Sequence, residues 1–90
     1  MILELYMLFD RVSQAYCSVI YQFKNVDVCK RTMPIIFNNP QFELKPFVND
    51  LQLFRLGVLD VGTGKITSDV KFIANCIDFV KGDDKNANKV

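Results

Sequence analysis

Glycine is concentrated in one stretch of this 90-residue chain: three of its four glycines fall within residues 57–64, and Lys65 follows directly. A phosphate-binding loop of the form G-x-x-x-x-G-K-[ST] would use such residues, because its backbone amides and lysine contact phosphate and its hydroxyl contacts magnesium. In one register Thr63 stands where the lysine is required. In the other register Leu59 replaces the first glycine and Ile66 replaces the hydroxyl residue. The stretch therefore does not predict a nucleotide-binding loop.

A hairpin turn accounts for the same residues. The segment before Asp60 alternates like a strand, residues 60–64 (DVGTG) are turn-formers, and Lys65 begins a second strand-like segment. Asp60 can accept backbone hydrogen bonds within such a turn, and Gly64 can adopt the positive φ of a bulged hairpin loop. We therefore interpret the stretch as the bend between two antiparallel strands.

Few other residues have types that suit catalysis or metal binding. The chain contains no histidine, so it offers neither a Ser-His or Cys-His pair nor a mixed Cys/His zinc site. Its three cysteines, Cys17, Cys29 and Cys76, show no CxxC spacing and are expected to be buried, reduced thiols. Glu4 and Asp78 lie inside apolar runs, and either partial burial or an outward-facing position on a strand would fit them; we favour the outward-facing position. The sequence thus predicts no catalytic residue, no cofactor or cofactor-binding residue, no metal ligand and no enzymatic activity.

Four basic residues are the candidates for contacts with nucleic acid. Lys24, Lys30 and Arg31 lie close together in the sequence, and Arg11 could approach them in space. Aromatic side chains that could stack on the bases of a single strand are Tyr16, Tyr21 and Phe23. The formal net charge of only +1 provides little general attraction for phosphates. The alternative is that these charges solvate the outer face of a helix while the aromatic rings fill the core.

The elements that would position these residues begin with a predicted hairpin. Every odd position of residues 1–9 is apolar, a period of two that is typical of a strand. Residues 10–14 are polar, and the alternation resumes over residues 15–23. Two such runs around a short polar link predict an antiparallel pair of strands.

The period then changes to that of a helix. Apolar side chains at spacings of three and four form a stripe, made by Val26, Cys29, Met33 and Phe37. Asn25 is a suitable N-cap, and Asp27 suits the positive first turn. Because a proline removes one backbone hydrogen bond, Pro34 predicts a helix that is short or kinked at Met33–Pro34.

The second half of the chain contains the strongest strand pattern. Residues 38–50 hold two prolines and several turn-formers and are expected to form a surface loop. Residues 51–59 are apolar on both faces, which indicates a central strand or a sheet whose second face is covered by a partner subunit. Residues 65–70 (KITSDV) are expected to form the return strand. Residues 70–80 fit either a short strand, which we favour, or a helix.

Together these elements predict an α+β fold. We expect a small antiparallel sheet of four to five strands, in the order strand-strand-helix-strand-strand with an optional further strand, and one helix packed on one face. Residues 1–81 are expected to form a single domain and residues 82–90 a disordered polar tail. Half of the residues are apolar, more than a core of this size readily covers, so a homo-oligomer is expected. No run has the length of a membrane span, and reduced cysteines suit the cytoplasm.

Two longer segments resemble a viral protein family. YMLFDRVSQAY resembles the opening of the small nonstructural proteins of gokushoviruses, single-stranded DNA phages of the Microviridae, and VNDLQLFRLGVLDVGTGKI is similar to a later segment of that family. The likeness covers roughly residues 5 to 70, and its matching positions in the second segment are Asp50, Leu53, Leu56, Gly57, Asp60, Thr63, Gly64 and Ile66.

The resemblance implies a nonstructural protein of phage replication, usually equated with the microvirus C protein. Such a protein would act in the host cytoplasm, at the switch from duplex to single-stranded DNA synthesis and at packaging of the genome into the procapsid. It would bind DNA or the replication complex. The alternative is an oligomeric adaptor that contacts capsid or replication proteins without binding DNA. Pro34 departs from the family pattern, in which an uninterrupted helix is expected, and this weakens any transfer of helix-borne DNA contacts.

Overall fold

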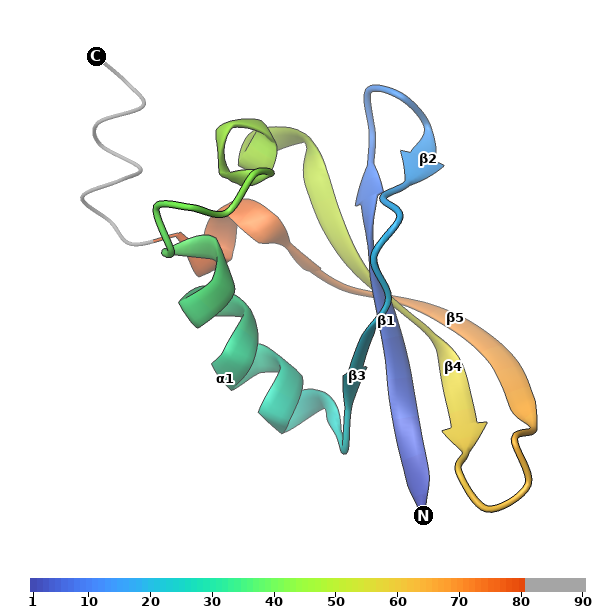
Figure 1. The fold of residues 1–90 in the computed structure, drawn as a ribbon. Helices are drawn as coiled ribbons and strands as arrows, with labels where there is room; N and C mark the ends of the chain where they lie inside the picture. The colour runs from blue at the N-terminus through green and yellow to red at the C-terminus, as the bar shows by residue number, and fades with distance from the viewer. Residues whose placement is uncertain (81–90) are drawn as a thin grey trace.

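The computed structural model describes residues 1–80 of the chain. It confirms an α+β fold with a small antiparallel sheet of five strands and one α-helix (Figure 1). In chain order the elements are β1 (Ile2–Asp10), β2 (Ala15–Tyr16), β3 (Tyr21–Phe23), α1 (Val26–Phe37), the 3-10 helix η1 (Lys45–Asp50), β4 (Leu51–Asp60), β5 (Ile66–Asn75) and the 3-10 helix η2 (Cys76–Phe79). The tail predicted for residues 82–90, and residue 81 of the predicted domain, lie outside the described residues.

The sheet is built around β1 and β4. Its strand order is β2-β1-β4-β5, and β3 pairs with the same edge of β1 as β2 does. All pairings are antiparallel. The longest pairing joins β1 to β4 and runs from Ile2 opposite Asp60 to Asp10 opposite Leu51, with an irregularity beside Leu5. The two most apolar strands therefore lie side by side at the centre.

The predicted hairpin at the start of the chain is present, but its second strand is interrupted. Residues 15–23 form two short strands, β2 and β3, separated by residues 17–20. The amide of Cys17 still donates to the carbonyl of Leu8, at 2.7 Å, and pairing resumes only at Tyr21 opposite Tyr6. Val19 and Ile20 in the gap are both half exposed. The expectation of one continuous strand over residues 15–23 is thus wrong.

Helix α1 begins and ends as its sequence requires, apart from its proline. The side chain of Asn25 accepts a hydrogen bond from the amide of Val28 at 2.9 Å, which confirms the predicted N-cap. The helix continues through Pro34 to Phe37, so of the two expected outcomes, a short helix or a kink at Met33–Pro34, the short helix is wrong. Helix formation survives because Phe37, one turn after the proline, is fully buried and anchors the last turn in the core.

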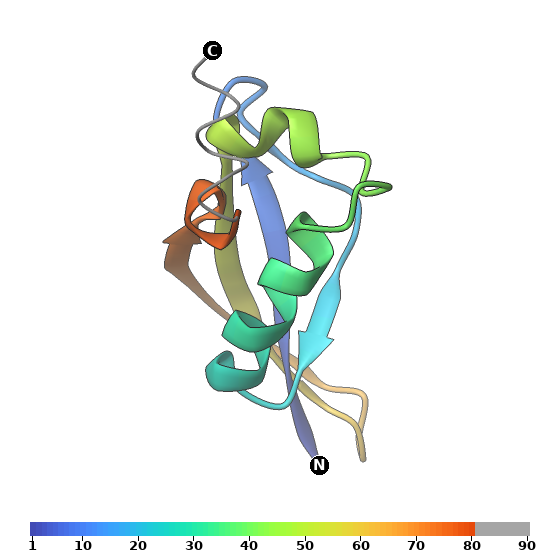
Figure 2. The same ribbon diagram turned by 90° about the vertical axis from the view of Figure 1, so that its left-hand side faces the viewer.

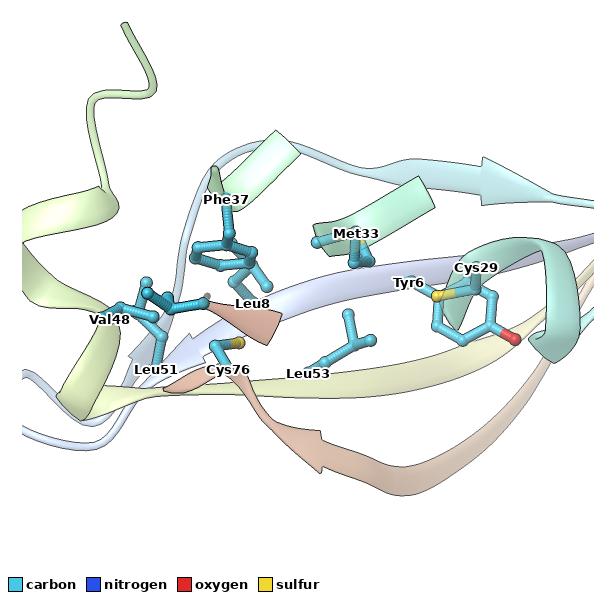
Figure 3. Packing of buried hydrophobic residues seen from close by; sticks show 10 residues of the cluster. Tyr6, Leu8, Cys29, Met33, Phe37, Val48, Leu51, Leu53 and Cys76 are labelled. Carbon is cyan, nitrogen blue, oxygen red and sulfur yellow. The ribbon is translucent and has the colours of Figure 1, made fainter. Parts of the chain in front are cut away.

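Figures 1 and 2 show α1 lying across one face of the sheet, with η1 and η2 beyond its C-terminal end. The stripe of α1 supplies Cys29, Met33 and Phe37 to the core. Figure 3 shows these side chains against Tyr6 and Leu8 of β1, and the remaining buried residues of this cluster are Val48, Leu51, Leu53, Cys76 and Val80. The core therefore lies between α1 and only one face of the sheet.

Two segments differ from the sequence predictions because side chains anchor them in this core. Residues 38–50 are not wholly a loop, since Lys45–Asp50 form η1 around the buried Val48. For residues 70–80 both alternatives hold in part: β5 extends to Asn75, and η2 then turns Cys76 inward. Among residues 1–80 no helix is long and apolar enough to cross a membrane.

Candidate nucleic-acid interface

Three of the four candidate basic residues lie at the N-terminal half of α1. Lys30 and Arg31 are exposed on its first turns, and Lys24 is exposed just before the N-cap. Within the described part of the chain, none of the three forms an ion pair with a carboxylate. Asp27 lies on the same part of the helix and lowers the local positive charge. The arrangement is a small basic cluster, which we call the α1 basic cluster: Lys24, Lys30 and Arg31.

Arg11 does not belong to this cluster. It directly follows the C-terminal end of β1, and its guanidinium donates to the carbonyl of Asn49 at 2.9 Å. Lys24 follows Phe23, which pairs with Glu4 near the other end of β1. Seven residues of strand at about 3.3 Å each separate these ends, so the backbone positions of Arg11 and Lys24 are about 23 Å apart along β1. The expected approach of Arg11 to the other three residues is wrong.

The aromatic candidates also separate. Tyr21 and Phe23 pack against the core, and the ring of Phe23 meets that of Tyr6 edge to face at 5.7 Å between centroids. These two rings therefore serve packing, as the alternative interpretation holds. Tyr16 is exposed, but it lies on the face of the sheet that α1 does not cover, away from the α1 basic cluster.

The best-organised charges in the described residues hold strands together. The guanidinium of Arg55 on β4 donates from Nε to Glu4 of β1 and from Nη1 to Asp69 of β5, both at 3.1 Å. The Tyr6 hydroxyl donates to the other oxygen of Glu4 at 2.7 Å. Burial raises the pKa of the Tyr6 phenol, and the hydrogen bond to Glu4 raises it further. Glu4 is thus half-buried and bonded, contrary to the expected solvent-facing position, and Arg55 is not free for phosphate.

The glycine-rich turn uses its own amides, which confirms the hairpin interpretation. The amides of Thr63 and Gly64 both donate to the Asp60 carbonyl, and that of Gly62 donates to the Asp60 side chain at 2.9 Å. Gly64 has the predicted positive φ, at 76°. Because these donors already have partners and a strand follows the turn, no amide cradle remains for a phosphate group.

The cysteines provide thiols that remain protonated. Burial raises the pKa of Cys29 and of Cys76 to about 12, and it raises the pKa of the half-buried Cys17 as well. A thiol with a raised pKa is a poor nucleophile at neutral pH. Residues 1–80 contain no group of three or more metal-ligating side chains. A hollow of about 280 Å³ is lined by Cys17, Tyr21 and the segment Gln41–Leu44, and burial raises the pKa of the Cys17 thiol and of the Tyr21 phenol.

One arrangement was missed by sequence reasoning: a row of four aromatic rings across the sheet. Phe9, Tyr16, Phe54 and Phe72 come from four strands and contact one another edge to face, with centroid separations between 5.1 and 6.0 Å. They lie on the face opposite to α1, which we call the open face. Tyr16 and Phe72 are 41 and 51 % exposed. The register that brings these residues together depends on long-range pairing, so no local pattern could reveal it.

Comparison with known proteins gives a single finding. The model of a family described as Phage ORF5 protein matches residues 3–79. The match extends from β1 to the end of η2 and so includes the central strands, α1 and the glycine-rich turn. Neither a curated protein nor a solved structure matches the chain. The description of the family indicates a phage protein and specifies no activity.

Proposed function

Because this chain belongs to the phage ORF5 protein family, we propose that it is a non-enzymatic, nonstructural phage protein that assists the switch from duplex to single-stranded DNA synthesis and the packaging of the genome. The finer assignment comes from the resemblance of two segments to gokushovirus nonstructural proteins. In this proposal the protein acts in the host cytoplasm and binds single-stranded DNA or the replication complex that carries it.

The observation that supports DNA contact is the α1 basic cluster. Its three side chains are exposed, and none of them forms an ion pair with a carboxylate of the described residues. Lysine and arginine that contact phosphates release condensed counterions, which favours binding and makes it depend on salt. With about 0.7 counterions released per contact on a single strand, three contacts give a slope of about −2 in a plot of log K against log salt.

The proposal is tested by measuring this slope with a fluorescent oligothymidylate. The wild-type protein is expected to bind with a slope of about −2, and the double variant Lys30→Glu, Arg31→Glu is expected to lose most of the affinity and flatten the slope. A matched control is Lys65→Glu, since Lys65 is exposed in the turn after β4 and likewise has no ion-pair partner in residues 1–80. Its slope should stay unchanged.

An adaptor that contacts capsid or replication proteins without DNA is the second candidate. The observation that favours it is the open face, whose aromatic row suits a protein surface better than a phosphate backbone. A wild-type slope near zero in the same experiment would reject DNA binding and leave the adaptor. Equal loss of affinity in the Lys65→Glu control would reject the α1 basic cluster as the contact.

A further inference from the structure

The open face lacks the charged residues that the core face of the sheet carries, and its polar residues in the three long strands are Gln52, Ser68 and Asn75. In β1 the side chains of Leu3, Met7 and Phe9 point to the open face, because partners in register share a face and Phe9 stands in the aromatic row. The core side of the same strand holds two charged residues, Glu4 and Asp10. The side of β1 that carries no charged residue therefore faces away from α1.

The same segregation extends across β4 and β5. Met7, Phe54 and Phe72 form one row across β1, β4 and β5. A parallel row nearer the N-terminus of β1 consists of Leu3, Leu59 and Ile66.

By contrast, the charged residues of β4 and β5 lie on the side of α1. The register pairs Arg55 with Tyr6 and with Lys71, and Asp69 contacts Arg55. The remaining charge, Asp60, pairs with Ile2, which lies two positions before Glu4 in β1 and therefore on the same face as Glu4. The three long strands therefore place no charge on the open face.

An antiparallel sheet that faces water on one side normally carries polar residues there. Here Ile66 and Phe72 are 63 and 51 % exposed, and no element of residues 1–80 covers them. The segment after Val80 is poorly suited to cover an uncharged surface, since three lysines and two aspartates are among its ten residues. We therefore expect this uncharged, aromatic surface to pack against an apolar surface of another molecule.

The size of the open face suits a second copy of this chain. Four strands about 4.8 Å apart and seven residues of β1 at about 3.4 Å give a footprint of about 450 Å². Two copies would bury about 900 Å² before the relief of the side chains is counted, close to the lower limit of specific interfaces. A two-fold contact places the same patch of both copies face to face, so a charged patch would meet its own charge and be repelled. The open face carries no charge on its three long strands, so this repulsion does not arise.

We propose that two copies of the protein pack open face against open face, with the row of Phe9, Tyr16, Phe54 and Phe72 buried in the interface. The dimer is a sandwich of two sheets with α1 of each copy on the outside. Both α1 basic clusters remain exposed in it, on opposite outer surfaces. The inference does not depend on DNA binding, which concerns the helices.

The test is the solution mass, measured by sedimentation over a range of concentrations, for two matched pairs of variants. Phe72→Lys and Ile66→Lys put a charge on the open face. Phe47→Lys on η1 and Ile35→Lys on α1 put the same charge at comparably exposed apolar positions, 55 and 73 %, elsewhere. The wild type and the two controls are expected to be dimers. The two open-face variants are expected to dissociate at least tenfold more readily while keeping the wild-type circular dichroism spectrum.

Each contrary result overturns the inference. A wild type that stays monomeric at about 0.1–1 mM, which means a dimer Kd of about 1 mM or weaker, would show that the open face has no useful self-affinity. Dimers that survive both open-face substitutions would place the contact elsewhere. A monomer whose Phe72 and Tyr16 ring resonances shift on adding oligothymidylate would assign the face to nucleobases instead. The salt slope tests DNA binding by the α1 basic cluster, whereas sedimentation tests dimerisation through the open face. Either proposal can therefore fail without the other.

Discussion

The thiols of Cys29 and Cys76 are buried at the centre of the core, without any exposed surface. Removal from water disfavours the charged form, so burial raises the pKa of each thiol from 9.0 to about 12. In the unfolded chain both thiols would ionise near pH 9. The difference links protonation to stability in the alkaline range and gives these residues a measurable signature.

We predict that stability falls as the pH rises from about 9 towards 12. Below pH 9 the two thiols stay protonated in both the folded and the unfolded state, so they add no pH dependence to the free energy of unfolding. Above pH 9 only the unfolded chain releases these protons, which stabilises the unfolded state relative to the folded one. At pH 10.5 the loss is about 1–2 kcal/mol for each thiol, with a smaller contribution from Tyr6, whose pKa is also raised. Urea denaturation at pH 7.5 and 10.5 measures it.

The double variant Cys29→Ala, Cys76→Ala is the control for this prediction. Although it should be less stable at pH 7.5 because of the lost volume, its further loss at pH 10.5 should be several-fold smaller than that of the wild type. An equal further loss in both proteins would mean that the two thiols are not the groups responsible.

Among individual residues, local roles were readable from sequence and long-range ones were not. Asn25 and Gly64 were predicted correctly because a cap and a turn depend on a few neighbouring residues. Arg55 received no role, although it joins three strands. Its partner Glu4 is 51 positions away, and only the register of β1 on β4 brings them together. The separation of Arg11 from Lys24 has the same cause.

At the scale of elements, α1 combines a strong start with a weakened middle. Its N-cap is satisfied, but Pro34 has no amide hydrogen, so the carbonyl of Lys30 lacks the usual helical donor four residues on. The buried Phe37 and the bond from the Asn38 amide to the Pro34 carbonyl, at 3.0 Å, hold the last turn in place. Packing thus outweighs the propensity on which the short-helix prediction depended.

We predict that Pro34→Ala raises the free energy of unfolding by about 1–3 kcal/mol. Alanine restores the hydrogen bond to Lys30 and relieves the steric conflict with the preceding turn. Pro40→Ala, in the exposed turn after α1, is the matched control and should change stability little. Chemical denaturation of the three proteins measures the difference. A lower stability of Pro34→Ala would indicate that the ring itself is needed for packing beside Ile35 and Asn38.

The strands were predicted where the period of two was long, in β1 and β4, and the turn between β4 and β5 where its residues were diagnostic. The predictions were wrong where tertiary contacts decide. The break between β2 and β3 and the 3-10 helix η1 depend on what each segment packs against. In η1, for example, the side chain of Val48 is buried against core residues that come from other elements. The same limit hid the aromatic row, which four strands assemble.

At the scale of the whole molecule, the strands of the sheet differ in how many neighbouring strands they pair with. Strands β1 and β4 have neighbours on both sides, whereas β5 has only β4 among the described residues. Two irregularities in the β4–β5 register twist that strand further away from regular pairing. Bulges and the charged pair of Asp69 and Lys71 are features that protect a strand edge from pairing with another chain. The edge of β5 is thus unsuited to be the interface.

We predict that amide hydrogens exchange most slowly in β1 and β4, and that alternate amides of β5 exchange at least tenfold faster. The fast amides are those that point away from β4. Exchange followed by nuclear magnetic resonance at dimer-forming concentrations measures both sets. Uniform protection along all of β5 would contradict the proposed sandwich, because it would mean that the two copies join by that edge.

The position of β1 in the sheet also has a consequence for synthesis of the chain. β1 is made first, but its long partner β4 begins only at Leu51, 41 positions after Asp10. At about 5–20 residues per second, a ribosome needs about 2–8 s to reach it. During that time the nascent chain holds a strand with one uniformly apolar side and only the short β2 and β3 to pair with. Translation therefore passes through an aggregation-prone stage, in which a pause before Leu51 or a shortage of chaperones would reduce the yield of folded protein.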